Sequence, residues 1–150
     1  MADLSDAMLS GADLSEADLR RAKLSRAQLI EANLSDADLS EAVLNSANLR
    51  RAELIRAELF DAKLSGANLS KAILREAKLH EANLHEANLE EADLVEAILV
   101  RADLCRSNLY RADLSDAIAK SANFQGAQLA KTSFQKLDRN GCLGNKNKGK

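Results

Sequence analysis

The sequence predicts an all-β solenoid with four sides, in which the chain turns a corner after every five residues. Leucine recurs at every fifth position from residue 4 to residue 134. The only exceptions among these 27 positions are Ala119, Phe124 and Phe134. Alanine stands two residues before each of these positions, and only Ser107 and Thr132 depart from this rule. The period of five and the spacing of two together determine the fold class.

Neither a helix nor a flat strand can bury leucines at this spacing. Five residues of an α-helix advance about 500°, so the leucines would spread around its whole circumference. In a flat strand, an odd spacing sends successive leucines to opposite faces. The chain must therefore change direction every five residues, as short extended segments joined by tight corners would do.

Each five-residue unit has an inward side and a corner. The alanine and the leucine point inward, and the residue between them points outward. The two residues after the leucine form the corner, where the frequent serine, glycine and charged residues suit a turn. Four units close a square of 20 residues, and such squares become stable by stacking. At a strand spacing of about 4.8 Å, nearly seven coils give a rod about 32 Å long.

The repeated motif resembles that of the pentapeptide-repeat proteins, whose pattern is A(D/N)LXX. The runs that carry the resemblance are Ala-Asp-Leu-Ser-Asp at 2–6, Ala-Asp-Leu-Ser-Glu at 12–16, Ala-Asn-Leu-Ser-Asp at 32–36 and Ala-Asn-Leu-His-Glu at 82–86. The resemblance implies a right-handed quadrilateral β-helix, and the hand comes from the resemblance alone. We expect this β-helix at residues 2–136, with about seven coils, followed by an irregular basic tail at residues 137–150.

Composition limits the setting of the protein. The net charge of −2 divides into −7 for residues 1–115 and +5 for residues 116–150. No run of 18 apolar residues occurs, and no signal peptide is visible, so we expect no membrane span and a cytoplasmic location. The two cysteines, Cys105 and Cys142, do not form a disulfide framework, which favours a reducing compartment.

Residues 20 apart should stack in columns along the rod, and two neighbouring columns form its most acidic side. Stacked carboxylates repel one another, so this side does not serve stability. The candidate interaction surface consists of Glu16, Asp36, Glu76, Glu96, Asp116, Asp93 and Asp113. Arg56 and Ile73 interrupt it, and a solvated face that keeps a leucine-filled rod soluble is the simpler interpretation.

The predicted function is that of a non-enzymatic structural or protein-binding solenoid with an unknown partner. The resemblance implies an alternative, because the quinolone-resistance group of pentapeptide-repeat proteins mimics duplex DNA and binds DNA gyrase. In that case the chain would be a DNA-mimic regulator of DNA gyrase or another topoisomerase. The surface charge is mixed in sign, which weakens any long-range field. Direct nucleic-acid binding is not expected, because no basic patch with aromatic platforms is present.

Catalysis and metal binding have little support in the pattern. His85 and Cys105 are 20 residues apart, so their side chains should be axial neighbours about 5 Å apart. Thiol activation would also need an orienting group and a water-excluding cleft, and a leucine-filled rod offers no cleft. Two histidines and one cysteine are a weak basis for a metal site. We therefore expect no enzyme activity, catalytic residue, cofactor or metal site.

Three further features of the surface and ends lead to predictions. One column of amides, from Gln28 to Gln128, should hydrogen-bond along the axis. Apolar residues at the corners, among them Phe60 and Val100, have two interpretations: a partner surface, or the scattered exposed apolar residues that are ordinary on proteins. The repeats begin at Ala2 without a visible cap, and uncapped sheet edges template further pairing, so we expect a homodimer through the N-terminal end.

Overall fold

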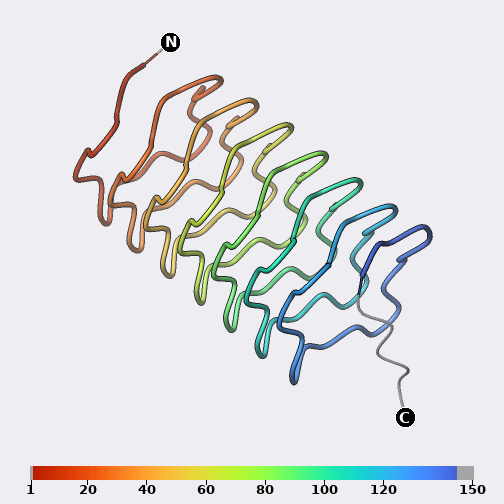
Figure 1. Ribbon diagram of the computed structural model, residues 1–150. Helices are drawn as coiled ribbons and strands as arrows, with labels where there is room; N and C mark the ends of the chain where they lie inside the picture. The colour runs from red at the N-terminus through yellow and green to blue at the C-terminus, as the bar shows by residue number, and fades with distance from the viewer. Residues whose placement is uncertain (1, 145–150) are drawn as a thin grey trace.

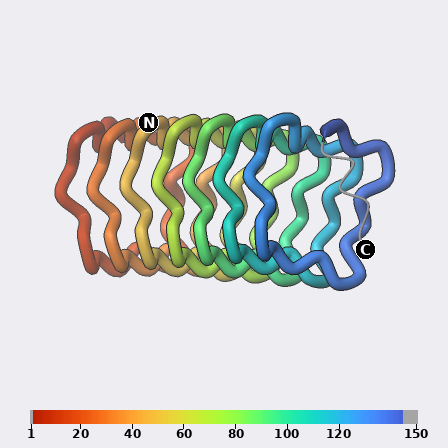
Figure 2. Tube along the Cα trace, turned by 60° about the horizontal axis from the view of Figure 1, so that its bottom comes forward, coloured from red at the N-terminus to blue at the C-terminus, as the bar shows by residue number. Residues whose placement is uncertain are grey.

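Parallel backbone bridges join each residue between an alanine and a leucine to the residue 20 positions further along the chain. In the computed structural model, which describes residues 2–144, these bridges run from Asp3–Lys23 to Asn123–Leu143. The described residues form no continuous strand and no helix, since each side of the square contributes a single bridge residue. Figures 1 and 2 show the resulting stack of square coils. The predicted right-handed quadrilateral β-helix is confirmed.

The interior of the rod is filled by the two repeating apolar positions. Every leucine from Leu24 to Leu114 is at most 1% exposed, and so is every alanine at the repeat position from Ala22 to Ala122. The leucines Leu4, Leu9 and Leu14 are only partly buried, because no described coil covers them. Each buried leucine contributes about 1.5–3 kcal/mol relative to an exposed one. The stack of coils therefore supplies the core that one coil alone lacks.

Within the unit at residues 83–87, every backbone N–H finds an acceptor. The amides of Asn83, Leu84 and Glu86 donate to carbonyls of the neighbouring coils, at 2.9, 2.7 and 2.9 Å. The amide of Ala87 donates to the carbonyl of Leu84 at 3.0 Å and closes the corner. The remaining amide, that of His85, donates to the side-chain Oδ1 of Asn83 at 3.0 Å. The fifth donor of the repeat thus depends on a side chain.

This side-chain bond explains why aspartate and asparagine dominate the position before the leucine. Their Oδ1 accepts from the amide two residues later, a local bond that these short side chains favour in turns. The residues that make it are Asp3, Asp13, Asp18, Asn33, Asp38, Asn48, Asn68, Asn83, Asn88, Asp93, Asp103, Asn108, Asp113, Asn123 and Asp138. At these positions the Asp or Asn side chain therefore stabilises the corner by accepting a backbone hydrogen bond.

The second corner residue adopts a left-handed backbone conformation throughout the rod. Among the described residues, 24 that are not glycine have φ between 53° and 60°, and all of them lie at this position. Positive φ there, together with the hydrogen bond that the next alanine amide donates to the leucine carbonyl, is typical of a type II turn. A side chain in this conformation costs about 1–2 kcal/mol. The bonds between coils must hold the turn in place against this cost.

Polar residues replace the repeat alanine at three places, and each donates to a carbonyl of the wall. Ser107 is fully buried, and its Oγ lies 2.8 Å from the carbonyl oxygen of Leu104. The hydroxyl of Thr132 donates to the carbonyl of Leu109 at 2.6 Å. The thiol of Cys142 donates to the carbonyl of Ala119 at 2.8 Å. The departures at Ser107 and Thr132 therefore leave no polar atom without a partner.

The bridge ladder continues past residue 136, where the repeat is predicted to end. Asp138 pairs with Ile118, and Leu143 pairs with Asn123. The part of the predicted tail up to residue 143 therefore adds to the stack, while residues 145–150 lie outside the described residues. Within the described part of the chain, no helix has the length and apolar character needed to cross a membrane. The homodimer through the N-terminal end stays a prediction.

Two neighbouring corner residues separate the cost of the left-handed conformation from side-chain contacts. Ser46 has φ of 57°, and Gly66 stands above it in the next coil with φ of 64°. A Cβ at residue 66 would lie 3.6 Å from Ser46 Oγ, an ordinary contact. We expect Ser46→Gly to stabilise the protein by about 0.5–1 kcal/mol and Gly66→Ala to destabilise it by a similar amount. Urea unfolding of both variants checks this, and shifts in the same direction would contradict it.

Candidate functional site

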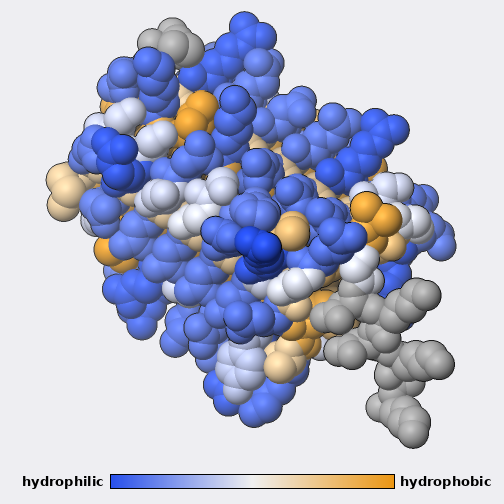
Figure 3. All heavy atoms as spheres, in the orientation of Figure 1, coloured by the Kyte–Doolittle hydropathy of each residue, from blue (hydrophilic) through white to orange (hydrophobic). Residues whose placement is uncertain are grey.

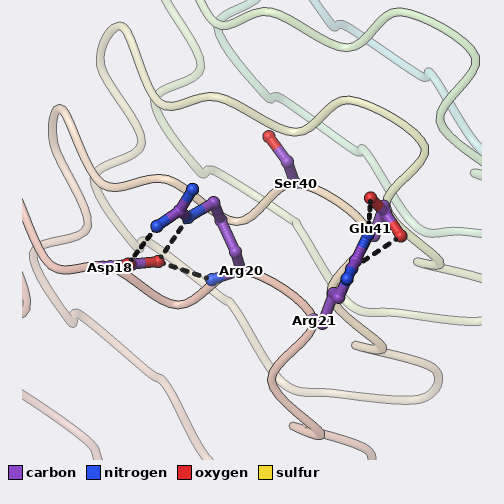
Figure 4. Close-up of a pocket in the computed structure, with 5 residues that line it drawn as sticks. All are labelled: Asp18, Arg20, Arg21, Ser40 and Glu41. Atoms are coloured by element: carbon purple, nitrogen blue, oxygen red, sulfur yellow. Dashed lines mark hydrogen bonds and ion pairs between the residues drawn. The ribbon is translucent and has the colours of Figure 1, made fainter. Parts of the chain in front are cut away.

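Among the described residues, one open hollow on the surface of the rod is lined by charged side chains that neutralise one another. It is lined by Asp18, Arg20, Arg21, Ser40 and Glu41 (Figure 4). Arg20 donates to both carboxylate oxygens of Asp18, at 2.8 and 2.6 Å. Arg21 donates in the same two-pronged way to Glu41, with both distances 3.0 Å. Because each arginine already has a carboxylate, this hollow presents no free charge to a ligand.

The second hollow retains two carboxylates without a counter-charge. It is lined by Asp36, Arg56, Glu58, Glu76, Lys78, Glu96 and Ile98. Within it, Arg56 pairs with Asp36 and Lys78 pairs with Glu58, each at 2.6 Å. Glu76 and Glu96 belong to successive coils of one column and make no ion pair among the described residues. We call these two residues the Glu76–Glu96 pair.

Longer-range attraction only partly offsets the charge of this pair. Arg56 interacts electrostatically with Glu76, and Arg75 with Glu96, but each arginine forms its ion pair with another carboxylate. Both glutamates are exposed at the corner, so water screens their mutual repulsion. Glu76 and Glu96 are therefore the exposed carboxylates of this hollow that lack an ion-pair partner among the described residues.

The predicted acidic surface is discontinuous in the structure. Three of its seven residues form ion pairs: Asp36 with Arg56 at 2.6 Å, Asp93 with Arg75 at 2.6 Å and Asp116 with Lys136 at 3.4 Å. Asp113 accepts hydrogen bonds from the amide and hydroxyl of Ser115. Glu16, Glu76 and Glu96 make no ion pair within the part of the chain that the structure describes. These seven positions therefore remain a predicted interaction surface, with the Glu76–Glu96 pair as its uncompensated centre.

Ion pairs between residues 20 apart neutralise much of the remaining corner charge. Such exposed pairs stabilise a protein by only about 0–1 kcal/mol each, so their main effect is on surface potential. Examples are Arg21–Glu41, Arg26–Asp6, Arg51–Glu31, Arg101–Glu81 and Arg111–Glu91. The signal for them is present in the sequence, because opposite signs often alternate at a spacing of 20.

The amide column and the apolar corners follow the predictions in part. Asn48 donates to Gln28 at 3.1 Å and Asn108 to Asn88 at 3.0 Å, so two links of the axial ladder form. The ring of Phe60 stacks on that of His80 with centroids 5.1 Å apart, and both side chains are half-buried. The face in Figure 3 is mainly hydrophilic with isolated apolar side chains. No broad apolar patch is visible on that face.

A second cluster brings together residues that can ligate a metal. The predicted proximity of His85 and Cys105 is confirmed, and Asp103 joins them, with one ligand atom from each residue within 4.8 Å of the others. All three are half-buried. Sequence reasoning missed Asp103, although it lies two residues before Cys105 on the outer face of the same side. Its position beside the thiol could have been found from the period.

Comparisons with known proteins agree with this architecture. The family model for pentapeptide repeats matches residues 2–36, 22–59, 32–70, 57–94 and 97–135, with 8 copies. The chain is similar to Rfr23, a pentapeptide repeat protein from the cyanobacterium Cyanothece 51142. That match has 35% identity over 62% of this chain and 64% of the other, with a TM-score of 0.61. Comparison with curated protein sequences finds no significant match.

Two further solved structures share the fold. One is a pentapeptide repeat protein from the Arabidopsis thaliana thylakoid lumen, with 34% identity over 73% of this chain and 66% of the other, and a TM-score of 0.53. The other is QnrB1, a plasmid-mediated fluoroquinolone resistance protein, with a TM-score of 0.65 over 97% of this chain and 87% of the other. At 19% identity, the second likeness shows the fold alone. The chain spans slightly less than two thirds of the length of the cyanobacterial and plant proteins.

The Asp18 carboxylate of the first hollow makes stability depend on pH. Hydrogen bonds from the Arg20 side chain, and then from its backbone amide, lower the pKa of Asp18 from 3.8 to about 2. Because the pKa is lower in the folded state, the stabilisation is fully present above about pH 4 and is lost as the pH falls through about 2. We expect Asp18→Asn, which keeps an acceptor for the Arg20 amide, to reduce the loss of thermal stability between pH 4 and pH 2.

Thermal unfolding followed by circular dichroism at several pH values measures this effect. The control is Asp61→Asn, at an exposed carboxylate that no ion pair or side-chain hydrogen bond engages among the described residues. An acid-induced loss equal in Asp18→Asn and the unchanged protein would show that the Asp18–Arg20 pair does not contribute.

Proposed function

Because this chain belongs to the pentapeptide repeat family, we propose that it is a non-enzymatic, protein-binding rod whose contact surface centres on the Glu76–Glu96 pair. One observation carries the proposal. Glu76 and Glu96 make no ion pair among the described residues, whereas the neighbouring carboxylates Asp36 and Glu58 pair with Arg56 and Lys78. A partner with lysine or arginine side chains would supply the missing counter-charge. The expected partner is therefore a protein with a basic surface.

The filled interior supports binding over catalysis. Leucine and alanine side chains occupy the axis with almost no exposure from the second coil to the sixth. Enzyme sites require a concave, water-excluding cavity, whereas both corner hollows here are open to solvent. The free cysteines Cys105 and Cys142 fit a reducing, cytoplasmic setting.

The shape of the hollow also suits a protein side chain. Ile98 lies beside Glu96 and offers apolar contact to the methylene stem of a lysine or arginine. The two glutamates stand one coil apart, about 4.8 Å, so a single cationic group can reach both carboxylates. Relief of the repulsion between stacked like charges adds to the attraction.

Regulation of DNA gyrase through DNA mimicry is the second candidate, and the rod shape shared with QnrB1 favours it. The ion pairs Asp36–Arg56, Asp93–Arg75 and Asp116–Lys136 weigh against it, because a DNA mimic needs an uninterrupted negative surface. We therefore rank it below a partner that contacts a short acidic segment.

Charge reversal tests the proposed contact. In Glu76→Lys/Glu96→Lys both carboxylates of the pair are replaced, and we expect affinity for the partner to fall at least about tenfold, because like charges then face each other. The matched control is Glu41→Lys/Glu81→Lys, which changes charge equally at carboxylates that already pair with Arg21 and Arg101. Quantitative capture from extract of the source cells, followed by titration of the captured protein, measures the effect. Equal binding by both double variants would refute the contact.

A supercoiling assay with purified DNA gyrase separates the two candidates. If the chain is a DNA mimic, it inhibits supercoiling with a strong salt dependence, and Glu76→Lys/Glu96→Lys relieves the inhibition. Under our main proposal, gyrase activity is unchanged at micromolar protein.

A further inference from the structure

We propose that His85, Asp103 and Cys105 form a binding site for a divalent transition-metal cation such as zinc. The three residues lie on the side and corner shared by two successive coils, and their ligand atoms lie within 4.8 Å of one another. They supply a nitrogen, an oxygen and a sulfur, all of which zinc accepts as ligands. The site is separate from the Glu76–Glu96 pair and does not depend on the proposed function.

The repeat holds two of the three ligands by their backbone. Asp103 Oδ1 accepts from the Cys105 amide at 3.0 Å, which ties the carboxylate to the residue that carries the thiol. The amide of Glu86, the next residue after His85, donates to the Cys105 carbonyl at 2.9 Å and fixes the two coils in register. The imidazole and the thiol therefore occupy equivalent corner positions one coil apart.

The two carboxylate oxygens of Asp103 have different surroundings. Oδ1 also accepts from Asn123 Nδ2, at 2.9 Å, whereas Oδ2 has no hydrogen bond or ion pair among the described residues. Oxygens held in this way orient the other oxygen of a ligating carboxylate. Asn123 is thus a positioning residue, and Oδ2 is the atom left to bind the cation.

The surrounding charges favour a cation. Glu86 Oε1 lies 3.5 Å from His85 Nε2, where a carboxylate can orient an imidazole whose other nitrogen binds metal. Arg106 opposes the cation but lies 3.5 Å from the same Glu86 oxygen, which partly neutralises it. The two carboxylates of Asp103 and Glu86 outnumber the one guanidinium, that of Arg106, among these residues.

The geometry and the ligand types select the metal. A tetrahedral zinc ion needs ligand atoms about 3.3–3.7 Å apart, so movements of roughly 1 Å by these half-buried side chains close the site. A thiolate and an imidazole favour zinc over magnesium or calcium, which prefer oxygen alone. On binding, the sulfur–metal bond replaces the S–H bond, and the proton passes to water. The fourth position is left for a water molecule.

Cobalt(II) titration of the full chain, without an affinity tag and in a Cys142→Ser background, tests the site. We expect one equivalent of cobalt to produce a thiolate charge-transfer band and tetrahedral visible bands, and zinc to displace it. Cys105→Ser should abolish the charge-transfer band. His85→Ser and Asp103→Asn should each weaken binding at least about tenfold, and Asn123→Ala should weaken it about tenfold.

These variants, apart from Asn123→Ala, which also removes the acceptor of the Gln125 amide, are chosen so that folding is preserved. Serine is common at the corner position and asparagine at the position before the leucine, and Asp103→Asn keeps an acceptor for the Cys105 amide. His80→Ser, on the adjacent corner, is the matched control and should bind cobalt like the parent. Absence of the thiolate band, binding that survives Cys105→Ser, or equal weakening by His80→Ser and His85→Ser would overturn the proposal.

Discussion

The backbone hydrogen bonds between successive coils set the position of every side chain on this rod. Each coil is 20 residues long because bridge residues such as Asn83 and Asp103 must lie in register. Parallel pairing at one constant offset is compatible only with corners of constant length. Once that offset is set, Leu24 to Leu114 meet at the axis, and residues 20 apart form straight columns at the surface. The core and the surface pattern are thus two results of the same ladder.

The ladder also accounts for features that look unfavourable in isolation. A left-handed corner residue such as Glu96, with φ of 60°, would not persist in a free peptide, because the conformation costs free energy. Its amide donates to the Ser115 carbonyl in the next coil, so the neighbouring coil holds the turn. The amide that no coil reaches, as at His85, is taken up by the preceding Asn83. The left-handed corner residue and the side-chain bond to the preceding Asn therefore belong to a structure that is stable only when its coils stack.

Surface chemistry on such a rod is decided by vertical neighbours. Arg56 forms an ion pair with Asp36 one coil earlier, whereas Glu76 and Glu96 stack as like charges and make no ion pair among the described residues. The same spacing brings the side chains of His85 and Cys105 together, and Asp103, two residues before Cys105 in the same coil, lies beside them. Function on this fold can therefore change by single substitutions in a column without any change in the core.

The sequence by itself determined the coil length, the inward residues and the columns, because a strict period of five admits only one way to bury Leu and Ala. It also placed His85 next to Cys105. Only the tertiary structure decided which carboxylates keep a free charge, since that depends on side-chain reach between coils, as at Arg75 and Asp93, which are 18 residues apart. It likewise decided that Asp103 turns one oxygen to the backbone and leaves the other free, because the geometry of the corner, absent from any spacing rule, sets that orientation.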